Sequence, residues 1–480
     1  MKTEDLVETT CSEASGDELP QLNSAVRRKV DLRLIPLVTI LYLCCFLDRS
    51  NLGNARIAGM AEDLKLSGMR YQVAAAAFFI TYSLLEIPCN ILLKLLRPSI
   101  WIPSMTLAWG IVMVSMSFVK TWQGLIIARS FLGIAESGLA PALAFYISSW
   151  YRHDEQARPI ACYFSAATLA GAFGGLLAFG IEKMNGIGGL HGWSWIFLLE
   201  GLITVIISLV AYWAMVDFPS TATFLSSIER ENLVEVLRRD TEGEPSHFEK
   251  KFVWEALMNP KSWLQALIFI GVTVPIYSFT LFLPTIIHAM GFSATNAQLL
   301  TIPPYAVGCV STIRIGVLSD RSRTRGPFIT AASLFAIIGY TMLLATNPET
   351  QPGVGYAGCI IVAMGIFPGV PLTLAWSGGN AGGSLKKAVT FGFIGMIGNL
   401  GGICASFVYR TQDSPRFRLG HGIMTGFLCL TFFGSLFGTV LYRRLNRAKE
   451  HMCTESNISL DKKAELSALG IDSPVFRYVL

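Results

Sequence analysis

The chain has 480 residues, of which 52% are hydrophobic and only 15% are charged, whereas about 25% of the residues of an average soluble protein are charged. This composition excludes an ordinary soluble enzyme and indicates a protein with many membrane-spanning segments. The formal net charge of +5 is too small to indicate a nucleic-acid-binding protein, so no nucleic-acid partner is expected.

The cysteines and histidines point away from metal and disulfide chemistry. The ten cysteines are scattered, mostly within apolar runs, and none forms a C-x-x-C pair, so neither a disulfide framework nor a zinc site is predicted. The six histidines include no H-E-x-x-H motif. We therefore expect no metal, no cofactor and no enzymatic activity. Residues 1–32 are polar and predict no cleavable signal peptide.

Twelve apolar runs of helical length follow one another along the chain. They cover residues 34–52, 71–93, 101–119, 123–147, 158–181, 193–216, 263–287, 297–318, 327–346, 354–376, 387–409 and 421–442. In hydrocarbon, each backbone N–H and C=O group must be satisfied within its own segment, so these runs are predicted to be α-helices. We expect an all-α polytopic membrane protein with twelve transmembrane helices in two six-helix bundles, residues 34–216 and 263–442.

The distribution of lysine and arginine predicts the orientation of these spans. Positive residues gather before the first span, after the last one and in alternate loops, for example at Lys94, Arg152 and Arg321. Because such residues are retained in the cytoplasm, the tails 1–33 and 443–480 are both expected there. The loop before the last span contains three arginines and is the exception. The plasma membrane is the expected location, with the vacuolar membrane as an open alternative.

A polar linker at residues 217–262 separates the two bundles. Its charges recur at helical spacing with both signs interleaved, at Glu229, Arg230, Glu231, Glu235, Arg238 and Arg239. This pattern is typical of a solvated surface helix with paired charges.

Six prolines lie within or beside three spans of the second bundle. They are Pro275, Pro284, Pro303, Pro304, Pro368 and Pro371. Because proline removes a backbone donor and clashes with the preceding turn, the seventh, eighth and tenth spans are predicted to be kinked or interrupted. Kinked helices suit a bundle that opens and closes.

Two motifs recur at nearly the same offset in the two bundles. A Gly-x-x-Gly-Gly motif begins at Gly171 in the fifth span and again at Gly398 in the eleventh, 227 residues later. The basic loop that begins at Gly316 has a degraded counterpart that begins at Asn90, 226 residues earlier. The repetition indicates parallel six-helix repeats, which are typical of secondary transporters. The glycines themselves predict close helix packing.

Ionisable side chains within spans are costly, so they are candidates for function. The first span carries Asp48 and Arg49, and the fourth carries Arg129 and Glu136 seven residues apart, hence on one face. A rise of about 1.5 Å per residue places Arg129 near the height of Asp48. If these spans are neighbours, two acids and two arginines converge in one place. The alternative is that Asp48 pairs with Arg129 only to hold the two spans together.

The chemistry of these four residues suggests a division of roles. A guanidinium keeps its charge and presents a planar fork to a carboxylate, so Arg49 and Arg129 are suited to bind an organic anion. Asp48 and Glu136 are suited to take up and release a proton as the arginines change partners. Anion binding and protonation would then be coupled.

Fewer polar candidates are found in the second half. Trp376, at the end of the tenth span, and Asn399, in the glycine-rich part of the eleventh, are candidates to contact the substrate. Asn399 fits a role in helix packing equally well. In the first half, Glu86 and Glu200 also lie within spans, and for both we favour a role in holding helices together.

Several segments resemble a known family. Residues Gly316 to Arg325 resemble the signature loop of the major facilitator superfamily, Gly-x-x-x-Asp-Arg-x-Gly followed by two basic residues, with Arg323 at the second glycine. This match identifies Gly316, Asp320 and Arg321 as a gating loop. Residues 48–55, 86–90, 129–136, 150–152 and 164–175 resemble the anion:cation symporter family in its fungal allantoate permease-like branch.

This resemblance, which extends from about Arg28 to Arg444, implies proton-coupled uptake of a small organic anion by alternating access. Allantoate, nicotinate, biotin, pantothenate and tartrate are examples of such substrates. By motif match, the resemblance assigns proton coupling to Asp48 and Glu136 and anion contact to Arg49, with Arg129 linking the two, and it places both candidates of the second half beside the cavity. A monomer in the bilayer is expected. An exporter of an acidic metabolite and a nontransporting nutrient sensor remain alternatives.

Overall fold

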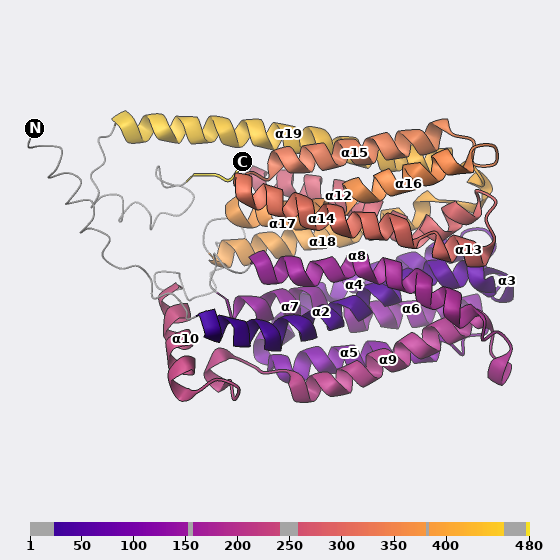
Figure 1. The fold of residues 1–480 in the computed structure, drawn as a ribbon, viewed down its shortest axis with the longest axis horizontal. Coiled ribbons are helices and arrows are strands. Elements are labelled where there is room, and N and C mark those ends of the chain that lie inside the picture. The colour runs from indigo at the N-terminus through magenta and orange to yellow at the C-terminus, as the bar shows by residue number, and fades with distance from the viewer. Residues whose placement is uncertain (1–23, 152–156, 241–257, 381–383, 456–476) are drawn as a thin grey trace, which may run out of the picture.

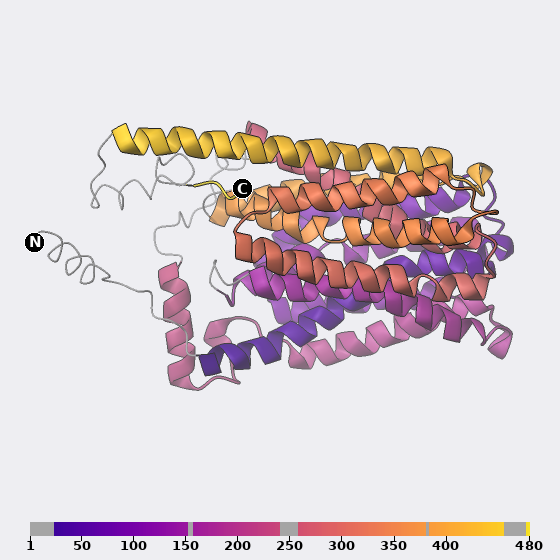
Figure 2. The same ribbon diagram turned by 45° about the horizontal axis from the view of Figure 1, so that its top comes forward.

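The computed structural model describes residues 24–151, 157–240, 258–380, 384–455 and 477–480, and all regular secondary structure in these ranges is helical. The helices run side by side in two groups (Figures 1 and 2). We call the end of this bundle where α2 begins and α19 ends the terminal end, and the other the opposite end.

The first group comprises α2 (Ser24–Ala55), α4 (Arg70–Leu95), α5 (Pro98–Met116), α6 (Trp122–Glu136), α7 (Leu139–Ser148), α8 (Ala157–Glu182) and α9 (Gly192–Ala214). The second comprises α12 (Pro260–His288), α13 (Ala294–Leu299), α14 (Ile302–Ser322), α15 (Gly326–Ala345), α16 (Pro352–Ile366), α17 (Gly369–Asn380), α18 (Ser384–Val408) and α19 (Arg418–Glu455). Short connecting helices are η1 (Arg56–Met60), α3 (Ala61–Asp63), η2 (Ile187–Gly189), η3 (Pro219–Thr221) and η4 (Thr411–Asp413).

The number and type of spans agree with the prediction. Ten helices of the described chain are long and apolar enough to cross a membrane. Helix α4 and the pair α6–α7 run alongside them and complete the two groups of six (Figure 1). The predicted all-α fold is therefore confirmed.

Several spans differ from their predicted bounds. The fourth is broken, because α6 ends at Glu136 and α7 begins at Leu139. At the break, a Cβ atom on Gly138 would lie only 2.8 Å from Cys89 Cβ on α4, so the close crossing of these helices requires glycine there. Helix α19 continues to Glu455 rather than ending near residue 442.

The proline prediction is confirmed for two of its three spans. The eighth span is interrupted between α13 and α14, just before Pro303, and the tenth between α16 and α17, at Pro368. Helix α12, by contrast, continues through Pro275 and Pro284. In the eighth and tenth spans, a proline lies where one helix has ended and the next begins, so the span is interrupted. The two prolines inside α12 are accommodated because neighbouring helices support the chain.

Helix α10 (Ser227–Asp240) lies across the terminal end and is the charged surface helix predicted in the linker (Figure 1). Within it, Arg238 donates two hydrogen bonds to Glu235, at 2.9 and 3.0 Å. The Lys29 ammonium donates to Glu229 Oε1 at 2.7 Å and joins α2 to α10. This hydrogen bond holds the pKa of the Glu229 carboxyl below its usual range.

The two halves meet where α2 faces α12, α4 faces α18 and α8 faces α13 and α14. The glycine motif of α8 packs closely there: a Cβ atom on Gly171 would lie 2.3 Å from the Tyr305 ring, and one on Gly175 would lie 2.6 Å from the Gln298 carbonyl oxygen. Nearer the opposite end, Gln72 donates to the Tyr409 carbonyl at 3.2 Å. The halves are therefore closed together on that side.

Candidate functional site

Asp48 lies on α2 with 1% of its surface exposed. Its partner is Trp109 on α5, whose indole N–H donates to Asp48 Oδ2 at 2.9 Å. The predicted alternative, in which Asp48 pairs with Arg129 to hold helices together, is therefore not the arrangement found. Asp48 instead faces the interior of the first half.

Arg49, one residue further along α2, faces α6. Its Nε donates to Glu136 Oε2 at 3.1 Å, and the two side chains are 10% and 0% exposed. Three aromatic rings surround the guanidinium carbon at 5.0 to 5.3 Å from their centres, those of Phe46, Phe78 and Tyr82. Cation–π attraction and the ion pair together compensate the burial of this charge.

Arg129 is held differently from Arg49. Its guanidinium carbon lies 4.6 Å from the centre of the Phe78 ring, so the two arginines share one ring. Its Nε and Nη1 atoms are buried and have no hydrogen-bond partner in the described chain. The structure thus brings Arg49, Arg129 and Glu136 together, as predicted. Asp48 lies beside them, between α2 and α5.

A third buried acid belongs to the same interior. Glu200 on α9 accepts a hydrogen bond from the Asn51 amide, which agrees with the helix-holding role predicted for it. Asp48 Oδ1, Glu136 Oε1 and Glu200 Oε1 are buried oxygens without a donor in the described chain. An unsatisfied buried oxygen is costly, and these three atoms lack a donor that buried carboxylate oxygens ordinarily have.

A second set of hydrogen bonds, separate from those of this cluster, joins the first half to the second. Glu86, one turn beyond Tyr82 on α4, accepts from the Asn399 amide of α18 at 2.9 Å. Asn399 Oδ1 accepts in turn from the Tyr277 hydroxyl of α12 at 2.8 Å, and the Tyr277 ring lies 4.9 Å from that of Phe79. The helix-pairing role predicted for Glu86 therefore extends across the interface between the halves.

Trp376 does not belong to this cluster. It lies on α17 with 0% of its surface exposed, and its indole N–H donates to the Val479 carbonyl at 2.8 Å. Its ring packs edge-on against Tyr442 of α19, with centres 5.5 Å apart. The structure therefore places Trp376 inside the second half, toward the terminal end.

The predicted gating loop joins α14 to α15 at the terminal end. Asp320 forms an ion pair with Arg325, and the exposed Arg321 lies in the last turn of α14. Gly316, five residues earlier, has open space where a Cβ atom would lie. Arg323, where the signature has its second glycine, has φ of +51°, the left-handed conformation that glycine adopts without strain.

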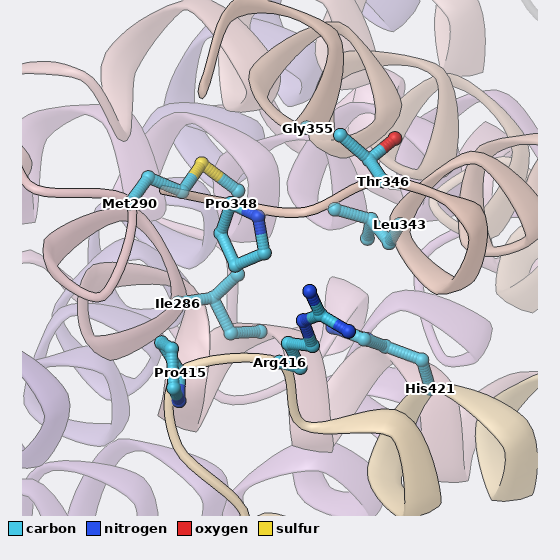
Figure 3. Close-up of a pocket in the computed structure, with 9 residues that line it drawn as sticks. All are labelled: Ile286, Met290, Leu343, Thr346, Pro348, Gly355, Pro415, Arg416 and His421. Atoms are coloured by element: carbon cyan, nitrogen blue, oxygen red, sulfur yellow. The ribbon is translucent and has the colours of Figure 1, made fainter. Parts of the chain in front are cut away.

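A separate pocket lies at the opposite end of the second half, between α12, α15, α16 and the segment before α19 (Figure 3). Its lining residues are Ile286, Met290, Leu343, Thr346, Pro348, Gly355, Pro415, Arg416 and His421. None of the predicted site residues is among them.

The aromatic wall of the cluster was not predicted from the sequence. Phe78, Tyr82 and Glu86 recur every four residues on α4, so they share one face of that helix. This spacing was the available signal. Trp109, the partner of Asp48, carries no comparable signal, because it is one of ten tryptophans and no local pattern distinguishes it.

The sequence over residues 38–406 matches the family profile of the Major Facilitator Superfamily. The chain belongs to this superfamily. The High-affinity nicotinic acid transporter of Saccharomyces cerevisiae is 31% identical over 484 residues, which cover 100% of this chain and 89% of the relative. An MFS-type transporter of Penicillium expansum is 33% identical over 470 residues, covering 94% and 90%. The protein is thus a membrane transporter of the major facilitator type.

Solved structures have the same fold. A bacterial homolog of the human lysosomal transporter Spinster superposes with a TM-score of 0.63 at 16% identity, covering 84% of this chain and 95% of that one. The xylose transporter XylE from E. coli gives 0.60 at 14% identity, covering 85% and 96%. At these identities the likeness concerns the fold alone.

Proposed function

We propose that this transporter imports a small organic anion together with protons, and that Arg49 binds the carboxylate of that anion. The observation that carries the proposal is the buried ion pair between Arg49 and Glu136. Only the Nε atom of Arg49 bonds to Glu136, and its side chain retains some exposure beside the interface of the two halves. The remaining donors of the guanidinium can bind an arriving carboxylate, which then competes with Glu136 for this cation.

The rings around Arg49 favour an aromatic monocarboxylate. Phe46, Phe78 and Tyr82 flank the guanidinium and provide surfaces on which a flat ring can pack. A relative of similar length is named a nicotinic acid transporter, and nicotinate is a flat aromatic carboxylate. We therefore propose nicotinate as the first substrate to test.

Proton coupling would follow from competition for one guanidinium. An arriving carboxylate displaces the Glu136 carboxylate from Arg49, and the fully buried Glu136 then loses its ion-pair partner. An unpaired buried charge is costly, so Glu136 takes up a proton. One anion and one proton then enter together, and the net charge of the cavity is unchanged. Asp48, with one oxygen lacking a donor, is proposed as a second proton carrier.

Direction and orientation are part of the same proposal. We place the terminal end in the cytoplasm of a cell and the opposite end outside its plasma membrane, in agreement with the lysines and arginines of the loops. The contacts between the halves near the opposite end then correspond to a state that is closed to the outside. Import requires these contacts to separate and the halves to close at the terminal end.

Uptake of labelled nicotinate into cells that lack their own nicotinate uptake tests the proposal. Arg49→Ala should lower uptake at least tenfold at equal surface abundance, and Arg238→Ala, on the exposed face of α10, should leave it unchanged. Unlabelled nicotinate and other small carboxylates should compete, whereas the neutral nicotinamide should not. Normal uptake by Arg49→Ala, or equal competition by nicotinamide, would contradict the proposal. Net loss of label from preloaded cells would indicate an exporter.

A further inference from the structure

The last described segment of the chain, residues 477–480, lies at the terminal end of the second half (Figure 1). It is separated in sequence from α19, which ends at Glu455. Nevertheless it contacts α12, α15, α17 and α19 through the hydrogen bonds and ring contacts described below. Neither the proposed anion site nor the proposed coupling residues use it.

Two asparagine side chains bind the backbone of this segment. Asn446 on α19 accepts from the Tyr478 N–H at 2.8 Å and donates to the Tyr478 carbonyl at 2.9 Å. Asn380 on α17 does the same for Val479, at 2.8 and 3.1 Å. Because each amide meets both a donor and an acceptor of one residue, the site recognises extended backbone.

The remaining backbone contacts complete this recognition. The Val479 carbonyl also accepts from the indole N–H of Trp376 at 2.8 Å. The Leu480 carbonyl accepts from the backbone N–H groups of Arg325 and Gly326, which lie at the start of α15, directly after the signature loop. These donors at a helix start have no intrahelical partner of their own.

The side chains fill matching spaces. The Tyr478 ring stacks on Tyr442, with centres 5.2 Å apart and planes at 17°. Lys261 and Lys449 place their ammonium groups 4.3 and 5.0 Å from the centre of this ring, and Lys261 donates to its hydroxyl. The Tyr478 residue is 5% exposed.

Val479 packs where a glycine leaves room. A Cβ atom on Gly379 would lie 3.0 Å from Val479 Cγ2, so a larger residue at this position of α17 would displace the segment. The space at Gly379, the backbone hydrogen bonds and the aromatic contacts thus all fit one extended peptide segment.

We infer that the terminal end of the second half contains a peptide-binding site for an extended aromatic–aliphatic–aliphatic tripeptide, and that residues 478–480 of this chain are its occupant. Docking joins the end of α17, the start of α15 and the long α19 into one unit. Release of the segment frees the signature loop and α17 from each other. This gives Trp376, Asn380 and Asn446 a shared role as ligands of the segment.

Hydrogen exchange of the purified full chain, followed by mass spectrometry, tests the inference. Peptides covering residues 477–480 and 325–328 should exchange at least tenfold more slowly than unstructured peptides of the same sequence. Asn446→Ala should remove this protection from residues 477–480, whereas Asn347→Ala, in the loop at the opposite end of α15, should not. Exchange of residues 477–480 at the rate of a free peptide in the unchanged chain would overturn the inference.

A second variant separates the site from its occupant. Val479→Asp places a charge against Gly379 and should release the segment while α12 and α18 keep their protection. Exchange at residues 325–328 should then rise at least tenfold. A synthetic peptide with the sequence of residues 474–480 should restore the protection, and a scrambled peptide should not. Failure of the native peptide to restore it, or equal restoration by the scrambled one, would reject a specific peptide site.

Discussion

Arg49 on α2 and Glu136 on α6 are joined by a hydrogen bond of 3.1 Å between Nε and Oε2, although 87 residues separate them in the chain. Glu136 is the last residue of α6, where the fourth span breaks. Its other oxygen has no donor in the described chain. Under the proposed function, we expect the protonation of this carboxyl group to depend on what else Arg49 binds.

Glu136→Gln tests this dependence. The amide does not gain or lose a proton near neutral pH but can still accept a hydrogen bond from Arg49, so exchange of labelled for unlabelled anion across proteoliposome membranes should continue. Accumulation driven by a pH gradient should fall at least tenfold. Glu235→Gln on the surface helix α10 provides the control and should change neither. Full pH-driven accumulation in Glu136→Gln would remove this residue from the coupling mechanism.

The hydrogen bond between Glu86 and Asn399 joins the two halves, and its acid and amide can be swapped by mutation. Asn399→Asp places a second carboxyl group 2.9 Å from that of Glu86, and uptake should drop at least tenfold because two acids in one buried site repel each other. The double variant Glu86→Gln with Asn399→Asp restores one donor and one acceptor. It should recover at least a third of the original uptake at equal surface abundance. A double variant no better than Asn399→Asp alone would show that the bond itself is unimportant.

Gly175 sets how closely the halves approach. In Gly175→Val, a Cβ atom would lie 2.3 Å from Thr301 Oγ1 and 2.6 Å from the Gln298 carbonyl oxygen, so the seam between α8 and α13 cannot close. Amides of α13 should exchange hydrogen at least tenfold faster, and uptake should be lost. Gly180→Val on the same helix, where the space is open, should behave as the unchanged chain. Unaltered hydrogen exchange of α13 in Gly175→Val would contradict the close contact between α8 and α13 in solution.

Arg323 has the left-handed conformation, with φ of +51°, directly after α14. A residue with a side chain loses about 1 kcal/mol in this conformation, so Arg323→Gly should stabilise the protein and raise its melting temperature in detergent. Arg321→Gly lies inside the last helical turn, where glycine costs about 1 kcal/mol of stability. This variant should therefore lower the melting temperature. A fall in melting temperature for Arg323→Gly would mean that the arginine makes contacts worth more than its strain.

The Lys29–Glu229 pair predicts a titration. Because the hydrogen bond from Lys29 lowers the pKa of Glu229, its contribution to stability is present above the ordinary pKa of a glutamate. This contribution is lost as the pH falls through the lower, folded value. In Lys29→Gln the Glu229 pKa should rise, as followed by carboxyl NMR of selectively labelled protein. An unchanged titration would show that the pair does not persist in solution.

Much of the fold could be predicted from the sequence. Hydropathy is a local property, so the apolar runs identified the spans, and the charges of residues 229–239 identified helix α10. The ionisable residues Asp48, Arg49, Arg129 and Glu136 were also visible locally, since such residues are rare within apolar runs. The glycine motif on α8 indicated the close packing that the structure shows against Tyr305.

The sequence by itself thus determined the number of spans, their helical nature and which charges lie within them. Only the tertiary structure decided the partners: Asp48 bonds to Trp109, Arg49 to Glu136, and Trp376 to Val479. These pairs are separated by 61, 87 and 103 residues. Whether two such side chains meet depends on how each helix is rotated about its axis and where it breaks. Those are settled by packing between helices and not by the local order of residues.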